Sequence, residues 1–381
     1  MIKGFRNTNI YVYGKGIIQT NLSIALGKIK EIGDIICEDD FLQLDDSYIV
    51  IPGFVDKHTH GANGSDFMRP DKKNLQQIVT TIPREGTTSC LATTMTEAKD
   101  TIHKALENIA EFMEEEYEGA EILGIHLEGP FVSPTFAGAQ PLQYIIPCDI
   151  PTFDSFNQSA KGNIKQVTLA VEENGFPLIN HLLQKNIIVS LGHSNATHEE
   201  ARKAIQAGAT SITHTFNAMS PFHHRDIGLV GTALLDTVSC ELICDLIHVS
   251  PSAVALLYKN KGKEQICLIT DSMEAKYMPE GRYELGGQEV FVKGNEARLK
   301  DGTLAGSTLK MNEAVRNFKN TTGVSFTDAV DCATIYPARC IHVDDKKGSI
   351  EMGKDADFTV VDKDFNVYMT ICRGKVVYSR S

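Results

Sequence analysis

The sequence predicts an α/β fold, a (β/α)8 TIM-type barrel with a small β-sandwich domain formed by the N- and C-terminal segments. From about residue 50, short β-rich runs alternate with helical runs, which is typical of a parallel barrel. No GxGxxG motif follows the first apolar run, which weakens the alternative of a doubly wound nucleotide-binding sheet. We expect residues 1–50 and 346–381 to form the small domain and residues 51–345 the barrel.

Both chain ends consist of strand-like runs that stop at turns. Near the N-terminus, Ile10–Tyr13 precedes two glycines, and Lys28–Gly33 ends on a third. Near the C-terminus, Ala356–Val361, Val367–Ile371 and Gly374–Tyr378 have a similar pattern. Short β-branched or aromatic runs bounded by glycine are typical of strands joined by turns. This pattern separates both ends from the central region.

In the central region, seven apolar runs are predicted as strands and an eighth is a candidate. Ser250 with Pro251 marks one helix start, Thr197 marks another, and Gly208 marks a helix end. The predicted strands are Ile49–Asp56, Thr87–Thr93, Glu121–Leu127, Ile187–Leu191, Ser211–Thr215, Glu241–Ile247 and Gln265–Ile269, with Leu304–Gly306 as the candidate eighth. The predicted helices are Lys72–Arg84, Lys99–Glu115, His198–Ala207, Pro251–Lys259 and Leu309–Asn320.

The composition argues against several classes of function. The net charge of -12 argues against nucleic acid or an anionic membrane as a partner, and an anionic substrate would need a local basic pocket. No apolar run approaches the ~20 residues of a membrane span, and the N-terminus lacks a secretory signal. The nine cysteines are scattered and odd in number, which favours reduced core residues. We expect a cytoplasmic protein.

The most informative feature is the pair of histidines in His58-Thr-His60, at the end of an apolar run. Residues i and i+2 of a strand project from one face, so both imidazoles can reach one point. A single histidine is more often a surface or core residue. Here, however, single polar residues end four further apolar runs, which indicates a site that binds a divalent metal and activates water. These residues are Glu128, His193, His214 and Asp271.

Several segments resemble a known family. Pro52–Gly61 resembles the opening metal motif of the amidohydrolase superfamily. Within that superfamily, the chain is similar over almost its whole length to the N-acetylglucosamine-6-phosphate deacetylases. The HxH motif alone is specific only to the superfamily, whereas the other segments are narrower. They are Gly124–Phe131, Leu191–Ser194, Thr213–Met219, Leu268–Asp271 and Leu304–Ser307.

The resemblance implies a role for each matching residue. Glu128, His193 and His214 would hold the catalytic metal. His58 and His60 would complete a second metal position, with Glu128 bridging the two. One or two divalent ions per subunit are expected, and zinc, iron, manganese and cobalt all suit these ligands. Asp271 would be the catalytic acid/base. The substrate contacts would be Ala139, Gln140, Asn217, Ala218, Arg225, His248, Leu304, Ala305, Gly306 and Ser307.

The resemblance also implies a homodimer, with Arg225 able to reach across its interface. Arginine suits this role because it binds two phosphate oxygens at once and is permanently charged.

Gln140 departs from the family pattern, because some family members have a histidine there and glutamine cannot be cationic. His248 could polarise a carbonyl or bind the sugar phosphate, but it could equally cap the turn at Ser250. For Asp271 the alternative is a turn residue, since Asp followed by Ser is common in turns.

Taken together, these residues predict hydrolysis of the acetamide of N-acetyl-D-glucosamine 6-phosphate. Metal-bound water can become hydroxide near neutral pH, and Asp271 can take its proton and return it to the leaving nitrogen. The nearest alternative is the same reaction on the galactosamine epimer. More distant alternatives are another amidohydrolase reaction, such as cyclic amide opening or deamination, and a scaffold without catalysis. All six polar positions are present, which argues against the scaffold.

Overall fold

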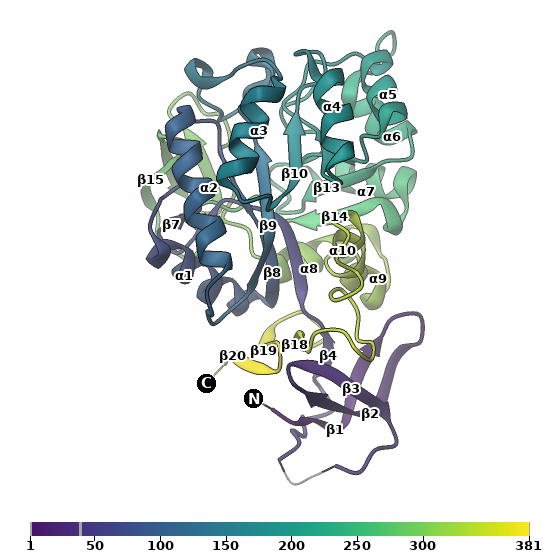
Figure 1. The fold of residues 1–381 in the computed structure, drawn as a ribbon. Coiled ribbons are helices and arrows are strands. Elements are labelled where there is room, and N and C mark those ends of the chain that lie inside the picture. Colours follow the sequence, from purple (N-terminus) through teal and green to yellow (C-terminus); the bar gives the residue numbers. More distant parts are fainter. Residues whose placement is uncertain (1, 38–39, 381) are drawn as a thin grey trace.

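The computed structural model describes residues 2–37 and 40–380, and its larger part is a parallel barrel (Figure 1). The eight barrel strands are hydrogen-bonded in the order β14-β13-β12-β11-β10-β9-β8-β5, which confirms the predicted fold class. Their side chains are buried on both faces, as expected for a sheet covered by helices. The strands are β5 (Phe54–Thr59), β8 (Thr87–Thr93), β9 (Glu121–Glu128), β10 (Ile164–Leu169), β11 (Ile188–Leu191), β12 (Ser211–Ile212), β13 (Ser239–Ile243) and β14 (Ile266–Ile269).

The helices around the barrel follow from amphipathic runs with clear caps. In α5, Thr197 and Glu200 form a capping box, and Gly208 ends the helix in the left-handed conformation at φ 118°. Ser250 caps α7, as predicted. The helices are α1 (Lys72–Thr81), α2 (Lys99–Met113), α3 (Ile150–Ser159), α4 (Gly175–Gln184), α5 (His198–Ala207), α6 (Gly228–Leu235), α7 (Pro251–Lys261), α8 (Met311–Thr322), α9 (Phe326–Asp331) and α10 (Ile335–Cys340). The helices α3, α4, α6, α9 and α10 were not among the predicted ones.

One predicted strand is wrong. Leu304–Gly306 is a loop in which Leu304 makes only an isolated bridge to Arg298. The missing barrel strand is β10, whose sequence Ile-Lys-Gln-Val-Thr-Leu is interrupted by polar residues. Gln166 and Thr168 of β10 are nevertheless fully buried, because their hydrogen-bond partners lie inside the barrel. Because these polar side chains point into the barrel interior, a search for apolar runs does not find this strand.

The barrel closes between its first and last strands, β5 and β14. The backbone N–H of Asp271, just after β14, donates to the carbonyl of His58 at 2.9 Å. The N–H groups of His60 and Gly61 both donate to the carbonyl of Ser272. These bonds lie at the carboxyl ends of the strands, so the closure forms at the mouth of the barrel, where the predicted site residues lie.

The two chain ends build a second, smaller sheet at the opposite end of the barrel (Figure 1). Its strand order is β20-β19-β18-β4-β1-β2-β3. The β2–β3 hairpin folds back so that the Ala356 N–H donates to the Gly27 carbonyl at 2.8 Å, and the sheet encloses its own apolar core around Phe5 and Phe358. The strands are β1 (Gly4–Val12), β2 (Gly16–Ala25), β3 (Lys28–Gly33), β4 (Ile49–Pro52), β18 (Phe358–Val361), β19 (Val367–Cys372) and β20 (Lys375–Ser379). We propose that residues 1–50 and 346–381 form a domain separate from residues 51–345.

A three-stranded antiparallel sheet follows β14 and extends to the barrel mouth. Its strands are β15 (Gly281–Leu285), β16 (Gln288–Lys293) and β17 (Glu296–Leu299). The side chain of Gln288 donates to the carbonyl of Ala139 at 2.6 Å, which joins this sheet to the loop after β9. A short hairpin of β6 (Gly61–Ala62) and β7 (Ser65–Asp66) follows β5. Both insertions therefore lie next to the site.

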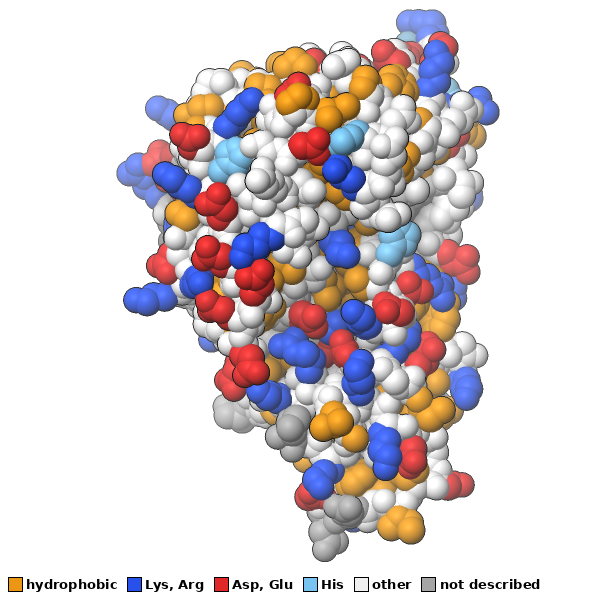
Figure 2. Space-filling model, in the orientation of Figure 1, with side chains coloured by type: hydrophobic (Ala, Val, Ile, Leu, Met, Phe, Trp, Pro, Cys, Tyr) orange, Lys and Arg blue, Asp and Glu red, His pale blue; other side chains and the backbone are white. Residues whose placement is uncertain are grey.

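The surface is mixed in charge on the face seen in Figure 2, where basic and acidic side chains are interspersed without a large patch of one sign. In the described parts of the chain, no helix combines the length and the apolar character needed to cross a bilayer.

Lys347 joins the barrel to the small sheet. Its side chain is only 1% exposed, and its Nζ lies 2.6 Å from Glu121 at the start of β9. The same Nζ lies 2.6 Å from Asp357 and 2.9 Å from Asp355, which precede β18. These carboxylates raise the pKa of Lys347 despite its burial, so the ammonium stays charged. One buried cation thus holds together carboxylates from both parts of the fold.

We expect Lys347→Met to lower the free energy of unfolding by about 3–5 kcal/mol, because three carboxylates, of which Asp357 is buried, lose their buried cation. Urea unfolding followed by circular dichroism measures this change. Lys28→Met is the control, since Lys28 contacts Asp355 at 3.1 Å but is 53% exposed, and should change the free energy by less than about 1 kcal/mol. Equal effects of both substitutions would contradict the role of Lys347.

Candidate metal centre and active site

The predicted metal ligands and the predicted acid/base Asp271 lie at the carboxyl ends of five barrel strands. Glu128 is the last residue of β9, and His58 lies near the end of β5 with His60 just beyond it. His193, His214 and Asp271 each lie two residues beyond their strands β11, β12 and β14. All three have left-handed backbones, at φ 46°, 27° and 49°. This conformation turns the chain at the end of each strand, at a cost of about 1–3 kcal/mol per residue.

The first candidate ligand group consists of Glu128, His193 and His214, which lie close enough together to hold a metal ion. The Nε2 atoms of the two histidines are 3.0 Å apart. Glu128 Oε1 lies 3.1 Å from His214 Nε2 and 3.3 Å from His193 Nε2. Metal–ligand bonds of about 2.0–2.2 Å at tetrahedral angles separate ligand atoms by about 3.3–3.6 Å. The Glu128–His193 separation of 3.3 Å lies in this range, and the other two, at 3.0 and 3.1 Å, are slightly shorter, so the three atoms lie close to the arrangement around a common divalent ion.

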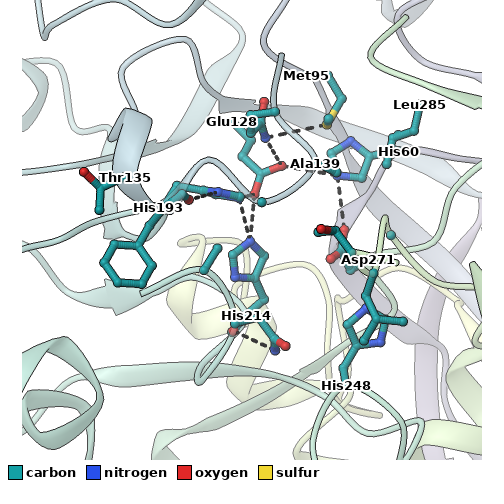
Figure 3. A pocket seen from close by; sticks show the side chains of 18 residues that line it. His60, Met95, Glu128, Thr135, Ala139, His193, His214, His248, Asp271 and Leu285 are labelled. Atoms are coloured by element: carbon teal, nitrogen blue, oxygen red, sulfur yellow. Dashed lines mark hydrogen bonds and ion pairs between the residues drawn. The ribbon is translucent and has the colours of Figure 1, made fainter. Parts of the chain in front are cut away.

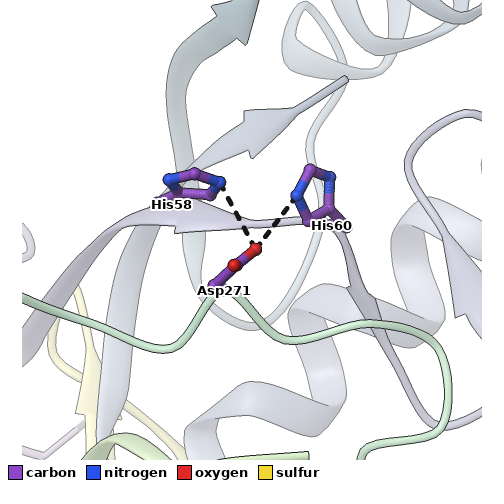
Figure 4. Close-up of side chains that lie close together, drawn as sticks. All are labelled: His58, His60 and Asp271. Atoms are coloured by element: carbon purple, nitrogen blue, oxygen red, sulfur yellow. Dashed lines mark ion pairs between the residues drawn. The ribbon is translucent and has the colours of Figure 1, made fainter. Parts of the chain in front are cut away.

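The second ligand group consists of His58, His60 and Asp271 (Figure 4). Asp271 Oδ1 lies 3.1 Å from His60 Nε2 and 3.4 Å from His58 Nε2. Glu128 lies between the two groups, with Oε1 at 3.5 Å from His58 and Oε2 at 3.3 Å from His60. His58 Nε2 is buried without a hydrogen-bond partner, as expected of a nitrogen whose lone pair serves a metal. This donor set also fits a divalent ion.

Charge is concentrated between these residues. Burial alone would raise the pKa of Glu128, but His58 and the hydrogen bonds from His193 and His214 hold the pKa well below its ordinary value. Burial alone would lower the pKa of His60, but its hydrogen bonds to Asp271 and Glu128 raise the pKa to about 9. Carboxylates that favour protons on these imidazoles also favour a metal cation in the same place.

Other residues orient the ligand imidazoles. His193 Nδ1 is 3.0 Å from the Phe136 carbonyl, to which it donates, so its Nε2 faces Glu128. His58 Nδ1 is 2.9 Å from Glu241 of β13. Sequence reasoning missed Glu241, because it begins a predicted strand, Glu241–Ile247, whereas the other site residues end theirs. Partners of this kind fix the ring and the nitrogen that can bind a metal.

A cavity of about 310 Å³ opens above both groups (Figure 3). His193 and His214 point toward Glu128 in this view, while His60 points toward Asp271 and His248 lies beside it. No lysine or arginine of the described chain lines the cavity. The lining residues are His60, Met95, Glu128, Thr135, Phe136, Gly138, Ala139, Gln140, His193, His214, Asn217, Ala218, His248, Asp271, Leu285, Thr303, Leu304 and Gly306.

Seven of the ten predicted substrate residues line this cavity: Ala139, Gln140, Asn217, Ala218, His248, Leu304 and Gly306. The Gln140 amide is already engaged, because its Oε1 accepts from the Thr96 N–H at 2.8 Å and its Nε2 donates to Glu128 Oε2 at 3.3 Å. His248 Nδ1 lies 2.6 Å from Asp245 Oδ2, which leaves Nε2 for the cavity. Gln140 thus supports a ligand as well as lining the cavity.

The other three predicted residues lie outside the lining. Ala305 is fully buried. Ser307 is also buried, where its hydroxyl donates to the Thr270 carbonyl at 2.6 Å and its N–H donates to the Asp271 carbonyl. Ser307 therefore holds the Asp271 backbone. Arg225 is exposed on the loop before α6, with Nη1 at 2.8 Å from His224 Nε2. Contact of these three residues with substrate stays a prediction.

Several lining residues were not predicted. Met95, Thr135, Phe136, Gly138 and Thr303 come from loops that carry no chemical motif. Leu285 comes from β15, whose place beside the mouth follows only from the tertiary fold. His126 lies beside the candidate ligands, with its Nε2 2.7 Å from Thr168 Oγ1 and its ring packed edge-on against His58.

Two ligand groups at the mouth of a (β/α)8 barrel are the arrangement of a metal-dependent hydrolase. The chain belongs to the amidohydrolase family, whose model matches residues 49–377.

The particular relatives are deacetylases. The chain is 48% identical to the N-acetylglucosamine-6-phosphate deacetylase of Bacillus subtilis (strain 168), over 87% of this chain and 85% of that protein. It is 39% identical to the N-acetylgalactosamine-6-phosphate deacetylase of Escherichia coli O157:H7, over 87% and 88%. The crystal structure of N-acetylglucosamine-6-phosphate deacetylase from Pasteurella multocida superposes with a TM-score of 0.93, at 31% identity and full coverage of both chains. The predicted resemblance is confirmed.

We expect Glu128→Ala to abolish metal binding at both groups, since its two oxygens face ligands of each. His60→Ala should remove only the second group. Metal per chain, counted by plasma emission after dialysis against zinc, measures both effects. A Glu128→Ala protein that retains the metal content of the unchanged chain would contradict the shared carboxylate.

Proposed function

We propose that this chain hydrolyses the acetamide of N-acetyl-D-glucosamine 6-phosphate to D-glucosamine 6-phosphate and acetate. The observation that carries the proposal is the joint presence of both ligand groups with Asp271 at the mouth, in a chain 48% identical to a deacetylase of that substrate. The cavity of about 310 Å³ also has the size of a site for a small ligand.

The chemistry needs an activated water and a proton for the leaving amine. A divalent ion, when bound, supplies hydroxide near neutral pH and polarises the carbonyl. Glu128, His193 and His214 would hold it, and His58 and His60 would hold a second ion. Asp271 takes the proton of the attacking water at its carboxylate and returns it to the nitrogen as the C–N bond breaks. His60 and His58, at 3.1 and 3.4 Å, keep that carboxylate in place.

The rest of the cavity binds and orients the sugar. His248 is held by Asp245 and presents its Nε2 to the acetyl oxygen or a sugar hydroxyl. Asn217 is anchored by donation from Nδ2 to the His214 carbonyl at 3.1 Å, so its amide oxygen faces substrate donors. Met95, Phe136 and Leu285 supply apolar walls that keep bulk water from the reacting amide.

The phosphate would be bound by Arg225 in a homodimer. A dianionic phosphate needs a cation, and the described lining contains neither lysine nor arginine. Arg225 is exposed and free to meet a second subunit. The chain would act in the cytoplasm, which is supported by nine cysteines without a disulfide among the described residues.

Deacetylation of the galactosamine epimer is the second candidate, favoured by the 39% identity to an enzyme of that name. Acetate release from both 6-phosphorylated epimers separates the two candidates, with kcat/KM as the measure. We expect the glucosamine epimer to be preferred. A higher kcat/KM for the galactosamine epimer would reverse the assignment, and no release from either would reject both.

Asp271→Asn should lower kcat by about 10²–10⁴-fold, because the amide cannot accept the proton of the attacking water. The metal held by Glu128, His193 and His214 should remain, as counted by plasma emission. Turnover close to that of the unchanged enzyme would remove Asp271 from the mechanism.

Arg225→Ala should raise KM for the phosphorylated substrate at least tenfold, since a charged hydrogen bond to phosphate contributes about 1.5–3 kcal/mol. Hydrolysis of unphosphorylated N-acetylglucosamine should be unchanged. Arg202→Ala is the control, because Arg202 is an exposed arginine on α5 that pairs with Asp236 and does not line the cavity. Equal losses on both substrates would show that Arg225 does not bind phosphate.

A further inference from the structure

Below the second ligand group, the barrel interior contains a buried ion pair, Lys57 with Glu241. Both side chains are fully buried, and Lys57 Nζ lies 2.9 Å from Glu241 Oε1. The remaining protons of the ammonium reach Gln166 Oε1 at 3.0 Å and Ser211 Oγ at 3.1 Å. The interior of such a barrel is usually filled by branched apolar side chains. A buried ion pair is no more stable than an apolar replacement, so stability alone does not explain it.

A backbone irregularity brings this pair next to the metal ligands. Between Asp56 and Thr59, β5 has one residue more than its partner β8. Such a bulge re-aims side chains. Lys57 and His58 are consecutive, yet both contact Glu241 inside the barrel, with His58 Nδ1 at 2.9 Å from Glu241 Oε2. One carboxylate therefore joins the ion pair to a metal ligand.

Every neighbour of the Glu241 carboxylate donates to it. Oε1 accepts from Lys57 Nζ and from Gln166 Nε2 at 2.8 Å. Oε2 accepts from the backbone N–H of His214 at 3.3 Å as well as facing His58 Nδ1. Only an ionised carboxylate can accept four donors. His58 must therefore carry a proton on Nδ1, which leaves Nε2, 3.4 Å from Asp271 Oδ1, as the nitrogen available to a metal.

We propose that Glu241 is the positioning residue of the second metal position and that Lys57 keeps it an acceptor. Glu241 holds the His58 ring with Nδ1 as donor, which leaves Nε2 to bind the ion together with His60 and Asp271. This inference rests on the proposed metal positions, but it concerns metal affinity and not the identity of the substrate. Of the first-position residues, His214 touches the pair only through its backbone N–H, 3.3 Å from Glu241 Oε2, and not through the imidazole that faces Glu128. The first position should therefore depend on the pair much less than the second.

Glu241→Gln tests the proposal, because an amide presents one acceptor and one donor to four donors. Cobalt(II) is titrated into metal-free protein, with calorimetry and the visible spectrum as readouts. We expect the unchanged chain to bind two equivalents. Glu241→Gln should weaken one of them about 10–100-fold and leave the other within threefold. Ser190→Ala is the matched control, since it removes a buried bond to Thr213 at 2.6 Å in the same interior without touching Glu241.

A second variant separates positioning from general damage to the core. Lys57→Met/Glu241→Gln removes the ammonium, so the Gln166 side chain can rotate and present its carbonyl oxygen to the NH₂ group introduced at position 241. The carbonyl oxygen at position 241 can then accept from His58 Nδ1. We expect this double variant to regain affinity to within about threefold of the unchanged chain.

Three results would overturn the inference. They are an unaltered second affinity in Glu241→Gln, an equal fall at both positions, and a double variant no better than the single one. If the unchanged chain binds only one equivalent, the second metal position and this inference fall together. Acetate release would then still decide the proposed function.

Discussion

The structure of the centre depends on one buried carboxylate, Glu128. Its two oxygens lie within 3.5 Å of a nitrogen on each of four histidines, which come from or just follow the strands β5, β11 and β12. Burying a carboxylate costs free energy unless it is paired with a donor or a cation. Four imidazoles that converge in the same place likewise need either a hydrogen-bond acceptor or a cation. The carboxylate and the imidazoles therefore offset each other's cost of burial. Their contacts form only when the barrel strands are in register.

Three of the site residues that follow strands share one backbone conformation. His193, His214 and Asp271 each stand two residues past the last hydrogen-bonded strand residue, in the left-handed region. The cost of that conformation is met by neighbours that hold the turns. For Asp271 these are the backbone bonds to His58 and Ser307, so part of the loop predicted to contact substrate also holds the backbone of Asp271.

The convergence of the candidate ligands could be predicted from sequence because each stands alone at the end of an apolar run, and the capped helices could be predicted because Thr197 and Ser250 bond locally. The residues that were missed depend on long-range packing. The strand β10 has polar side chains that are satisfied only across the barrel, and Leu285 reaches the cavity from an inserted sheet. Glu241 looks like part of a core strand until His58 and Lys57 are placed beside it.

The place of the second ligand group in the chain has a consequence for folding. His58 belongs to the first barrel strand and Asp271 follows the last, and these are the two strands whose direct backbone pairing is sparse. A cation shared by them would cross-link the two edges of the sheet. Its binding free energy would then oppose separation of those edges. The metal concentration would therefore govern the lifetime of the closed barrel as well as the rate of substrate turnover.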